Sequence, residues 1–340
     1  MPSVIEIHRG QLIESRHRVS AAVVREDGTT LATSGDPDLV AFWRSCAKPF
    51  QAVPMIASGA ERAFAISDEQ LALACASHNG EARHVTLALR MLEQAGATEA
   101  DLICGPHSSI SDEVARAMAA RGALPTKAYN NCSGKHAGMI ALARHQQWGS
   151  AGYERPDHRV QQGCLEEVAR WTGVPESKVR HATDGCGVPS CAVPLRAMAL
   201  AWARLGAAGE GRPVEGVNAT SAAAAGRLFT AMRAHPFFVA GTGRLDTDLI
   251  DGSGGRIVAK VGAEGVYCAA IPELGIGLAL KVEDGAVRCL NPALLGLLDL
   301  VAPGITPPLA QHRGQPIMNT LGAQVGHMEA RMELDRAASK

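Results

Sequence analysis

The chain has 340 residues, of which 46% are apolar and 20% are charged, and this composition is typical of a globular protein with a large core. The formal net charge of −1 and the 4% aromatic content argue against nucleic acids and anionic membrane surfaces as partners. The first ten residues lack the apolar stretch of a secretory signal, and no apolar run is long enough to span a membrane. We therefore expect a soluble, cytoplasmic protein.

Strand patterns are found toward both ends of the chain. An apolar run at 19–24, the turn dipeptide Asp27-Gly28 and a second run at 29–34 predict a β-hairpin. Toward the other end, glycine-containing turns separate three apolar runs and predict an antiparallel meander with strands at 257–261, 266–271 and 276–282. The two groups can pair into one sheet, which would place the termini near each other.

The middle of the chain has helical patterns with start and stop signals. Ser111 is a predicted N-cap, Gly122 a predicted stop, and Pro292 stands at a first helical position with Asn291 as its cap. The predicted helices are 111–122, 135–148, 159–171, 195–205, 221–234 and 292–301.

These elements predict a mixed α/β or α+β fold. A central antiparallel sheet would be built from the N- and C-terminal segments, with helices on its faces and a helical insertion between them. Because no low-complexity linker or repeat interrupts the chain, we expect a single catalytic domain over residues 1–340.

The first chemical motif is Ser45-Cys46-Ala47-Lys48, which has the S-x-x-K spacing of acyl-transfer enzymes with an active-site serine. Pro49 predicts that a helix begins near Ser45, because proline is tolerated mainly in a first helical turn. A spacing of three then puts Lys48 on the same face as Ser45, where an uncharged amine can take the hydroxyl proton. A serine N-cap followed by a surface lysine is the alternative interpretation of this short pattern.

Two further motifs follow in the order expected of such enzymes. Ser77-His78-Asn79 matches S-x-N and follows an apolar segment, in a predicted polar loop. Lys260-Val261-Gly262 matches K-x-G within a predicted strand, where Gly262 would let a substrate approach closely. A plain turn and an edge-strand lysine would explain each motif alone, but the three motifs in this order favour catalysis.

A possible metal site lies in two polar, glycine-containing segments. Cys132 and Cys186 each stand in such a segment, and residue chemistry favours His136 as a third zinc ligand, because a lysine ligand must first lose its proton. The alternative is that both cysteines are small buried side chains. The odd number of nine cysteines and the missing secretory signal argue against a disulfide framework.

Taken together, these segments resemble the asparaginase II family, the rhizobial-type L-asparaginases. The resemblance covers nearly the whole chain, and the family's fold, similar to that of serine β-lactamases and glutaminases, is the fold it implies here. The segments that carry the resemblance are 5–18 (IEIHRGQLIESRHR), 44–50 (RSCAKPF), 77–81 (SHNGE), 131–138 (NCSGKHAG), 184–189 (DGCGVP), 239–244 (VAGTGR) and 260–266 (KVGAEGV).

The resemblance also implies roles for individual residues. Ser45 would be the nucleophile with Lys48 as its partner base, and Ser77 and Lys260 would form a second Ser–Lys pair that relays protons. Residues in or beside the same motifs are expected to contact the substrate: Arg44, His78, Asn79, Asp184 and Gly241.

A zinc ion is implied as well, held by Cys132, Lys135 and Cys186. This set replaces His136, the ligand that residue chemistry alone favours, with Lys135. The resemblance implies that the ion aids substrate binding near the site and does not perform the bond cleavage.

The sequence therefore predicts an L-asparaginase that hydrolyses L-asparagine to L-aspartate and ammonia, and the resemblance implies a homodimer. Two neighbouring lysines would lower each other's pKa, which would supply a neutral base. A glutaminase or a penicillin-recognising acyl enzyme would use the same motifs, although the expected cytoplasmic location argues against a cell-wall substrate. A zinc-dependent amino-acid sensor without catalysis is a further alternative.

Overall fold

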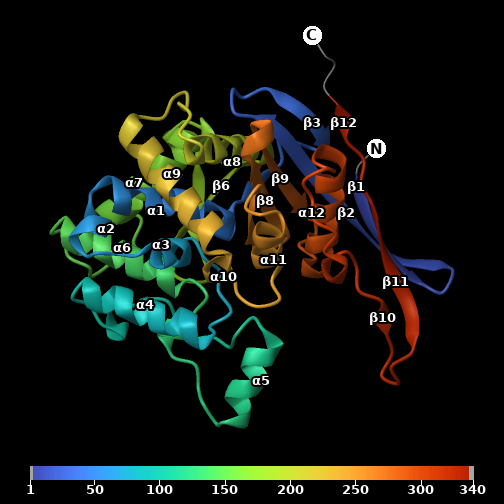
Figure 1. The fold of residues 1–340 in the computed structure, drawn as a ribbon, viewed down its shortest axis with the longest axis horizontal. Coiled ribbons are helices and arrows are strands. Elements are labelled where there is room, and N and C mark those ends of the chain that lie inside the picture. The colour runs from blue at the N-terminus through green and yellow to red at the C-terminus, as the bar shows by residue number, and fades with distance from the viewer. Residues whose placement is uncertain (1–2, 337–340) are drawn as a thin grey trace. The chain divides into compact units, whose positions relative to one another are not determined.

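The computed structural model describes residues 3–336 and divides them into two compact units. The first unit comprises residues 3–46, 193–206 and 248–336, and the second comprises residues 47–192 and 207–247. Each unit is therefore assembled from segments that are far apart in the sequence. In Figure 1 the first unit holds the blue and red strands, and the second holds most of the helices.

The first unit is built on an antiparallel sheet in the order β10-β11-β1-β2-β9-β8-β7, with β3 and β12 paired beside β2. Its strands join both ends of the chain, since β1 pairs with β2 on one side and with β11 on the other. They are β1 (Ser3–Arg9), β2 (Leu12–Arg25), β3 (Thr30–Ser34), β7 (Val258–Gly262), β8 (Val266–Ile271), β9 (Ile276–Val282), β10 (Ile317–Met318), β11 (Gln324–Arg331) and β12 (Asp335–Arg336).

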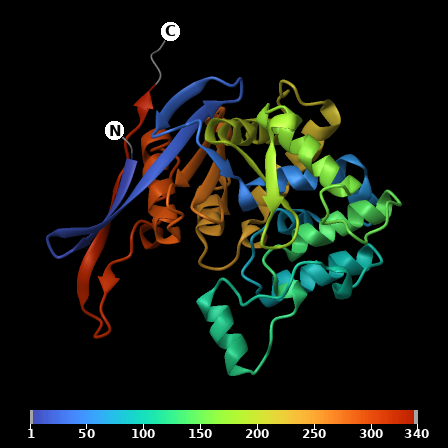
Figure 2. The ribbon, with the colours of Figure 1, turned by 180° about the vertical axis from the view of Figure 1, so that it is seen from behind.

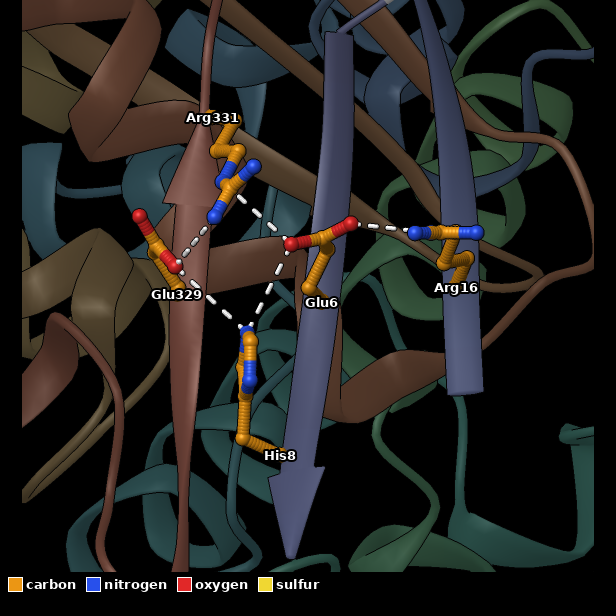
Figure 3. A network of polar contacts seen from close by, with 5 residues as sticks. All are labelled: Glu6, His8, Arg16, Glu329 and Arg331. Carbon is orange, nitrogen blue, oxygen red and sulfur yellow. Dashed lines mark hydrogen bonds and ion pairs between the residues drawn. The ribbon is translucent and has the colours of Figure 1, made fainter. Parts of the chain in front are cut away.

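A buried carboxylate links three of these strands. Glu6 on β1 accepts a hydrogen bond from Arg16 Nε on β2 at 2.8 Å, and its other oxygen lies 3.3 Å from Arg331 Nε on β11. Arg331 also contacts Glu329, and His8 lies between the two carboxylates (Figure 3). The network therefore joins the first two strands of the chain to one near its end.

Helices cover the sheet of the first unit. Helix α12 (Leu290–Val301) contacts β8, β9 and β11. Helix α8 (Leu195–Gly209) approaches β9 so closely that a Cβ on Gly277 would lie 2.1 Å from the backbone oxygen of Ala199. The short strand β4 (Val40–Phe42) and most of helix α11 (Leu245–Gly252) also belong to the first unit.

The second unit is mainly helical, and α1 (Lys48–Ala57) runs through its middle. Most of α1 is buried, because it contacts α3, α6, α7 and α9. Figure 2 shows these helices from behind. The helices of this unit are α1, α2 (Ala60–Ala63), α3 (Asp68–Ala74), α4 (Ala82–Gln94), α5 (Asp112–Ala120), α6 (Ser133–His145), α7 (Arg159–Thr172), α9 (Ala219–Ala234) and α10 (Pro236–Val239).

Smaller elements lie between the helices and strands of both units. Strands β5 (Arg180–Thr183) and β6 (Pro189–Pro194) form an antiparallel hairpin whose turn carries Cys186. Seven short 3-10 segments complete the described secondary structure: η1 (Arg44–Ala47), η2 (Glu99–Asp101), η3 (Lys127–Tyr129), η4 (Glu176–Lys178), η5 (Pro272–Leu274), η6 (Val287–Cys289) and η7 (Ala310–His312).

The predicted fold class is confirmed: an antiparallel sheet joins N- and C-terminal segments, helices cover it, and a helical segment is inserted between them. The hairpin, the meander and the six predicted helices are all present, with bounds that differ by a few residues. The predicted cap of the last helix is wrong, because α12 begins at Leu290 and Asn291 lies in its first turn. The 3-10 turn η6 leads directly into this helix and moves its start forward.

Two chain-wide properties bear on the sequence predictions. Within residues 3–336, no helix combines the length and the apolarity needed to cross a membrane. All nine cysteines are free and buried.

Candidate active site

Ser45 lies in the 3-10 turn η1, which leads directly into α1. Pro49 is the second residue of α1, so the prediction that a helix begins near Ser45 is confirmed. Arg44, the residue before Ser45, has a φ of +52°, a left-handed conformation that is uncommon for residues other than glycine and is found disproportionately at functional sites. The backbone in front of the predicted nucleophile is therefore strained.

Side chains on either side hold this turn in place. Trp43 Nε1 donates to Cys268 Sγ on β8 at 3.3 Å, and Trp202 Nε1 on α8 donates to the backbone oxygen of Cys46 at 3.2 Å. The Cys46 thiol in turn donates to the backbone oxygen of Lys260 at 2.9 Å. All five residues are fully buried, so the turn that carries Ser45 is fastened to the sheet of its own unit.

Lys260 lies on β7, at the edge of the sheet, yet its side chain is fully buried. Its Nζ donates to the backbone oxygen of Val261 at 2.9 Å. Gly262 lies against the Ser45 turn: an added Cβ would be 3.1 Å from both Cys46 Sγ and the backbone oxygen of Trp43. The K-x-G strand and residues 43–46 of the Ser45 turn therefore pack together within the first unit.

Lys48, the first residue of α1, is also buried, with 1% of its surface exposed. Its Nζ donates to Ser77 Oγ at 3.2 Å and to the backbone oxygen of Ala76. Burial of a lysine is costly unless its donors are satisfied, and here these two oxygens and the Cys132 thiol satisfy them. Ser45 and Lys260 belong to the first unit and Lys48 and Ser77 to the second, so the pairings Ser45–Lys48 and Ser77–Lys260 stay predictions.

The segment 77–79 is a loop, as predicted, but it is buried. Its three backbone N–H groups are all satisfied: those of Ser77 and Asn79 donate to the backbone oxygens of Val239 and Ala240, and that of His78 donates to Asn131 O. A buried loop is tolerated because these bonds replace those to water. The loop thereby brings the 131–138 motif and the 239–244 motif together.

His78 is held in one tautomer by its neighbours. Its Nδ1 accepts a hydrogen bond from the N–H of Gly80 at 3.1 Å, so its Nε2 carries the proton and donates to Ser133 Oγ at 2.9 Å. The ring also stacks on His84, with centroids 5.0 Å apart. Burial, reinforced by the charges of His84 and Lys48, holds the pKa of His78 well below 6.5. His78 is therefore neutral at pH 7.

Asn79 is oriented from both ends of its amide. Its Nδ2 donates to Glu81 Oε1 at 3.2 Å and to the backbone oxygen of Thr242 at 3.0 Å, while its Oδ1 accepts from Arg244 Nη1 at 3.0 Å. Gly241 has a φ of +124°, and a Cβ there would lie 2.7 Å from Asn79 Nδ2 and 2.6 Å from Glu81 Oε1. Gly241 therefore lies in close contact with the S-x-N loop.

Cys132, Lys135 and Cys186 converge in the second unit. All three side chains are at least nine-tenths buried, and Lys135 Nζ lies 3.1 Å from Cys186 Sγ. Asp184 supports the turn that carries Cys186, because its Oδ1 accepts from the N–H of Cys186 at 3.4 Å. His136, by contrast, has its Nδ1 2.6 Å from the hydroxyl of Tyr153.

The protonation of these three side chains bears on whether they could bind a metal cation. Burial opposes the charge on Lys135, but Cys186 and Cys132 outweigh that effect and raise its pKa. The hydrogen bond from Cys186 holds the pKa of Cys132 well below 9, against the opposing effect of burial. Two sulfurs and a nitrogen form a donor set that Zn²⁺ accepts, and the remaining protons would leave on binding. The residues present therefore fit the implied metal.

Sequence reasoning missed two residues that the structure brings to the site. Cys46 has no role of its own in the sequence predictions, although it joins the Ser45 turn to Lys260. Arg244 was quoted only as the end of a motif, although it contacts both Ser77 and Asn79. Neither leaves a signal in a single sequence, because both act through contacts that only the tertiary structure creates.

Comparisons with solved structures give similarities with low scores. Mglu in its native form in 4.3 M NaCl aligns with a TM-score of 0.38 and 15% identity, over 86% of this chain and 62% of Mglu. A β-lactamase from Mycobacterium bovis aligns with a TM-score of 0.37 and 15% identity, over 83% of this chain and 94% of that protein. The chain thus spans less than two thirds of Mglu, and TM-scores this low bear on neither activity nor substrate.

The sequence comparisons give one assignment. Among curated proteins no sequence matches significantly. The family model described as L-asparaginase II matches residues 5–330, which include both units and every motif discussed above. The chain therefore belongs to the L-asparaginase II family.

Proposed function

We propose that the protein hydrolyses L-asparagine to L-aspartate and ammonia through an acyl-enzyme on Ser45. The family supports an amidohydrolase. The observation that carries the proposal is the environment of Lys48, a buried lysine whose Nζ lies 3.2 Å from Ser77 Oγ. Within the described residues, no carboxylate lies at ion-pair distance from it. Lys48 also interacts with the Cys132 thiol, and a buried amine that faces a hydroxyl and has no carboxylate partner is suited to proton transfer.

The first half of the reaction forms an ester. Ser45 Oγ attacks the side-chain carboxamide carbon of asparagine, and its proton passes to Lys48 Nζ. Backbone N–H groups at the start of α1 stabilise the negative oxygen of the tetrahedral intermediate. The C–N bond then breaks as the proton held by Lys48 passes by way of Ser77 and Lys260 to the nitrogen, ammonia leaves, and Lys48 is again an uncharged base. A β-aspartyl ester remains on Ser45.

The second half returns the enzyme to its starting state. Water adds to the ester carbon and gives a proton to the lysine base, the bond to Ser45 Oγ breaks, and Ser45 regains its proton. One water molecule is consumed and one ammonia is released for each asparagine. Arg44, His78, Asn79, Asp184 and Gly241 are proposed to bind and orient the substrate during both halves.

Cys132, Lys135 and Cys186 are proposed to hold Zn²⁺. When bound, the ion supplies a positive charge that attracts the negative groups of an amino-acid substrate. Elemental analysis of protein purified without chelator tests this proposal, with about one zinc per chain expected for such a donor set. The double variant Cys132→Ser/Cys186→Ser should lose the metal, and metal content that the double variant retains contradicts the assignment.

The catalytic proposal is tested by comparing wild type with Ser45→Ala. We expect Ser45→Ala to lose about 10⁴-fold or more in kcat for ammonia release from L-asparagine. Mass spectrometry of quenched wild-type protein should show an aspartyl adduct that is absent from the variant. Ser58→Ala is the matched control, because Ser58 lies at the other end of α1, where its hydroxyl donates to the backbone oxygen of Met55.

The outcomes separate the alternatives. Wild-type kcat in Ser45→Ala contradicts the nucleophile, and faster ammonia release from L-glutamine than from L-asparagine indicates a glutaminase. Binding of asparagine without turnover or adduct indicates a sensor. The homodimer and the cytoplasmic location stay predictions.

A further inference from the structure

Arg244 is an arginine of the second unit that donates hydrogen bonds to two neutral oxygens. It is half-buried and lies just before α11, and its Nη1 donates to Asn79 Oδ1 at 3.0 Å and to the backbone oxygen of Ser77 at 3.3 Å. Both acceptors are neutral. Within residues 3–336 no carboxylate lies at ion-pair distance from this guanidinium. A partly desolvated positive charge is therefore held against the S-x-N loop without a counter-ion.

The unused edge of Arg244 has the geometry of a carboxylate receptor. Within the described chain its Nε and Nη2 make no hydrogen bond, since both of its side-chain bonds come from Nη1. Elsewhere in this chain the same Nε/Nη2 edge binds carboxylates with two parallel bonds: Arg256 holds Glu273 at 2.7 Å twice, and Arg155 holds Asp157 at 3.1 and 2.8 Å. Such bidentate pairs are the strongest that an arginine forms.

The neighbouring acid, Glu81, already has its own partners. Its Oε1 accepts from the N–H of Thr242 at 2.8 Å and from Asn79 Nδ2, and its Oε2 accepts from the Thr242 hydroxyl at 2.9 Å. Because Glu81 and Arg244 bind opposite ends of the Asn79 amide, that amide lies between the two charges. The hydrogen bonds of Arg244 Nη1 to Asn79 and Ser77 hold the guanidinium in place. Its positive charge can then bind a ligand.

We propose that Arg244 is the subsite for the α-carboxylate of the substrate, and that it restricts the enzyme to free amino-acid amides. The inference rests on the proposed function and deepens it. In asparagine only a methylene and the α-carbon separate the reacting amide from the carboxylate, so the two must be bound close together. Within the second unit Arg244 lies beside a proposed catalytic residue, since its Nη1 donates to the backbone oxygen of Ser77, whose hydroxyl lies 3.2 Å from Lys48 Nζ.

The test compares two ligands that differ only in the α-carboxylate: L-asparagine and 3-aminopropanamide. In Arg244→Met we expect the KM for L-asparagine to rise about 100-fold while kcat stays within about threefold, because the lost interaction is charge-assisted and binds ground and transition states alike. The inhibition constant of 3-aminopropanamide against asparagine turnover should stay within about twofold, since this ligand lacks the group that Arg244 binds. That constant is measurable whether or not the analogue is itself hydrolysed.

Two further variants keep the result unambiguous. Arg244→Lys retains the charge without the bidentate edge and should raise the KM by an intermediate amount, about 10-fold. Arg233→Met removes an arginine of the same unit that pairs with Glu210 and should change neither constant.

Each failure has its own signature. If Arg244→Met weakens both ligands equally, or lowers kcat alone, Arg244 only supports the Asn79 loop and the carboxylate subsite is wrong. An unchanged KM for asparagine also overturns it. Absence of asparagine turnover in the wild type overturns the proposed function instead.

Discussion

The thiol of Cys46 donates a hydrogen bond to the backbone oxygen of Lys260 at 2.9 Å, and so joins the residue that follows the predicted nucleophile to the strand that carries the second predicted lysine. Both residues are fully buried. A short, strained turn would otherwise be free to relax, because Arg44 in its first position adopts a left-handed conformation. This bond, together with the bonds of Trp43 and Trp202, holds Ser45 in place.

The first prediction concerns this anchor. Cys46→Ala should lower the free energy of unfolding by about 1–2 kcal/mol, because a buried hydrogen bond and its packing are lost. It should also lower kcat by about 10-fold or more, since small displacements of a reacting group are costly. Urea denaturation and asparagine turnover measure the two effects.

Cys289→Ala is the matched control for Cys46. It also removes a fully buried free thiol from the first unit, but one that lies in η6 and not beside Ser45. We expect it to cost stability with kcat unchanged. Equal losses of kcat in the two variants would refute the positioning role of Cys46.

The second prediction concerns Gly241. Alanine there should lower the free energy of unfolding by about 1–3 kcal/mol, because its φ is +124° and its Cβ would press on Asn79 and Glu81. Asparagine kcat/KM should fall about 10-fold, as the Asn79 amide is displaced. Gly243→Ala is the control, since its φ is +71° and no atom lies within 4 Å of the added Cβ. That variant should keep wild-type kcat/KM. If both variants lose kcat/KM equally, the contact of Gly241 with Asn79 and Glu81 does not explain the loss.

The third prediction concerns the pH dependence of stability. Burial lowers the pKa of both His78 and His84 below 6.5, so both are neutral in the folded protein near pH 7. Below pH 6.5 the unfolded chain binds protons that the folded chain does not, and the free energy of unfolding should therefore fall as pH decreases. The slope is up to about 1.4 kcal/mol per pH unit for each histidine.

His84→Gln tests this slope, because glutamine does not titrate and keeps an N–H donor for the backbone oxygen of Phe237, which His84 contacts at 3.0 Å. Urea denaturation between about pH 5 and pH 7 should show a flatter dependence in the variant than in wild type. His181→Gln, which changes an exposed histidine on β5, should leave the slope as it is. Identical slopes for wild type and His84→Gln would show that protonation of His84 does not contribute to the pH dependence of stability.

The fourth prediction concerns Glu6 and the joining of the chain ends. The hydrogen bond from Arg16, aided by the charges of Arg331 and His8, holds the pKa of Glu6 below its usual value of 4.5. The carboxylate therefore stabilises the fold above that pH and loses its effect as pH falls and it becomes protonated. Glu6→Gln should lower the Tm near pH 7, and the difference from wild type should shrink in acid and in high salt.

Glu14→Gln provides the comparison for Glu6, because the Glu14–Arg9 ion pair at 2.8 Å is exposed and joins two strands of one hairpin only. We expect a smaller change in Tm from it. A Glu6→Gln difference that does not vary with pH would mean that packing and not charge explains its effect.

Much of the architecture could be predicted from local patterns. Turn residues and alternating apolar runs marked the hairpin of β2 and β3 and the meander of β7 to β9, because these signals act between near neighbours. Strands β1 and β11 were missed, since each is stabilised by a partner from the other end of the chain. Pro49 located the start of α1, because the helix-breaking effect of proline is a local property.

The sequence by itself determined which chemical groups the chain carries, the serines and lysines at fixed spacing and the two thiols, and its membership of the L-asparaginase II family. Only the tertiary structure decided which groups meet. Lys48 contacts Ser77, Cys46 bonds to Lys260, and Arg244 bonds to Asn79. Each of these contacts joins segments that are far apart in the chain. Such contacts depend on how distant segments pack against one another, and a single sequence carries no local signal of that packing.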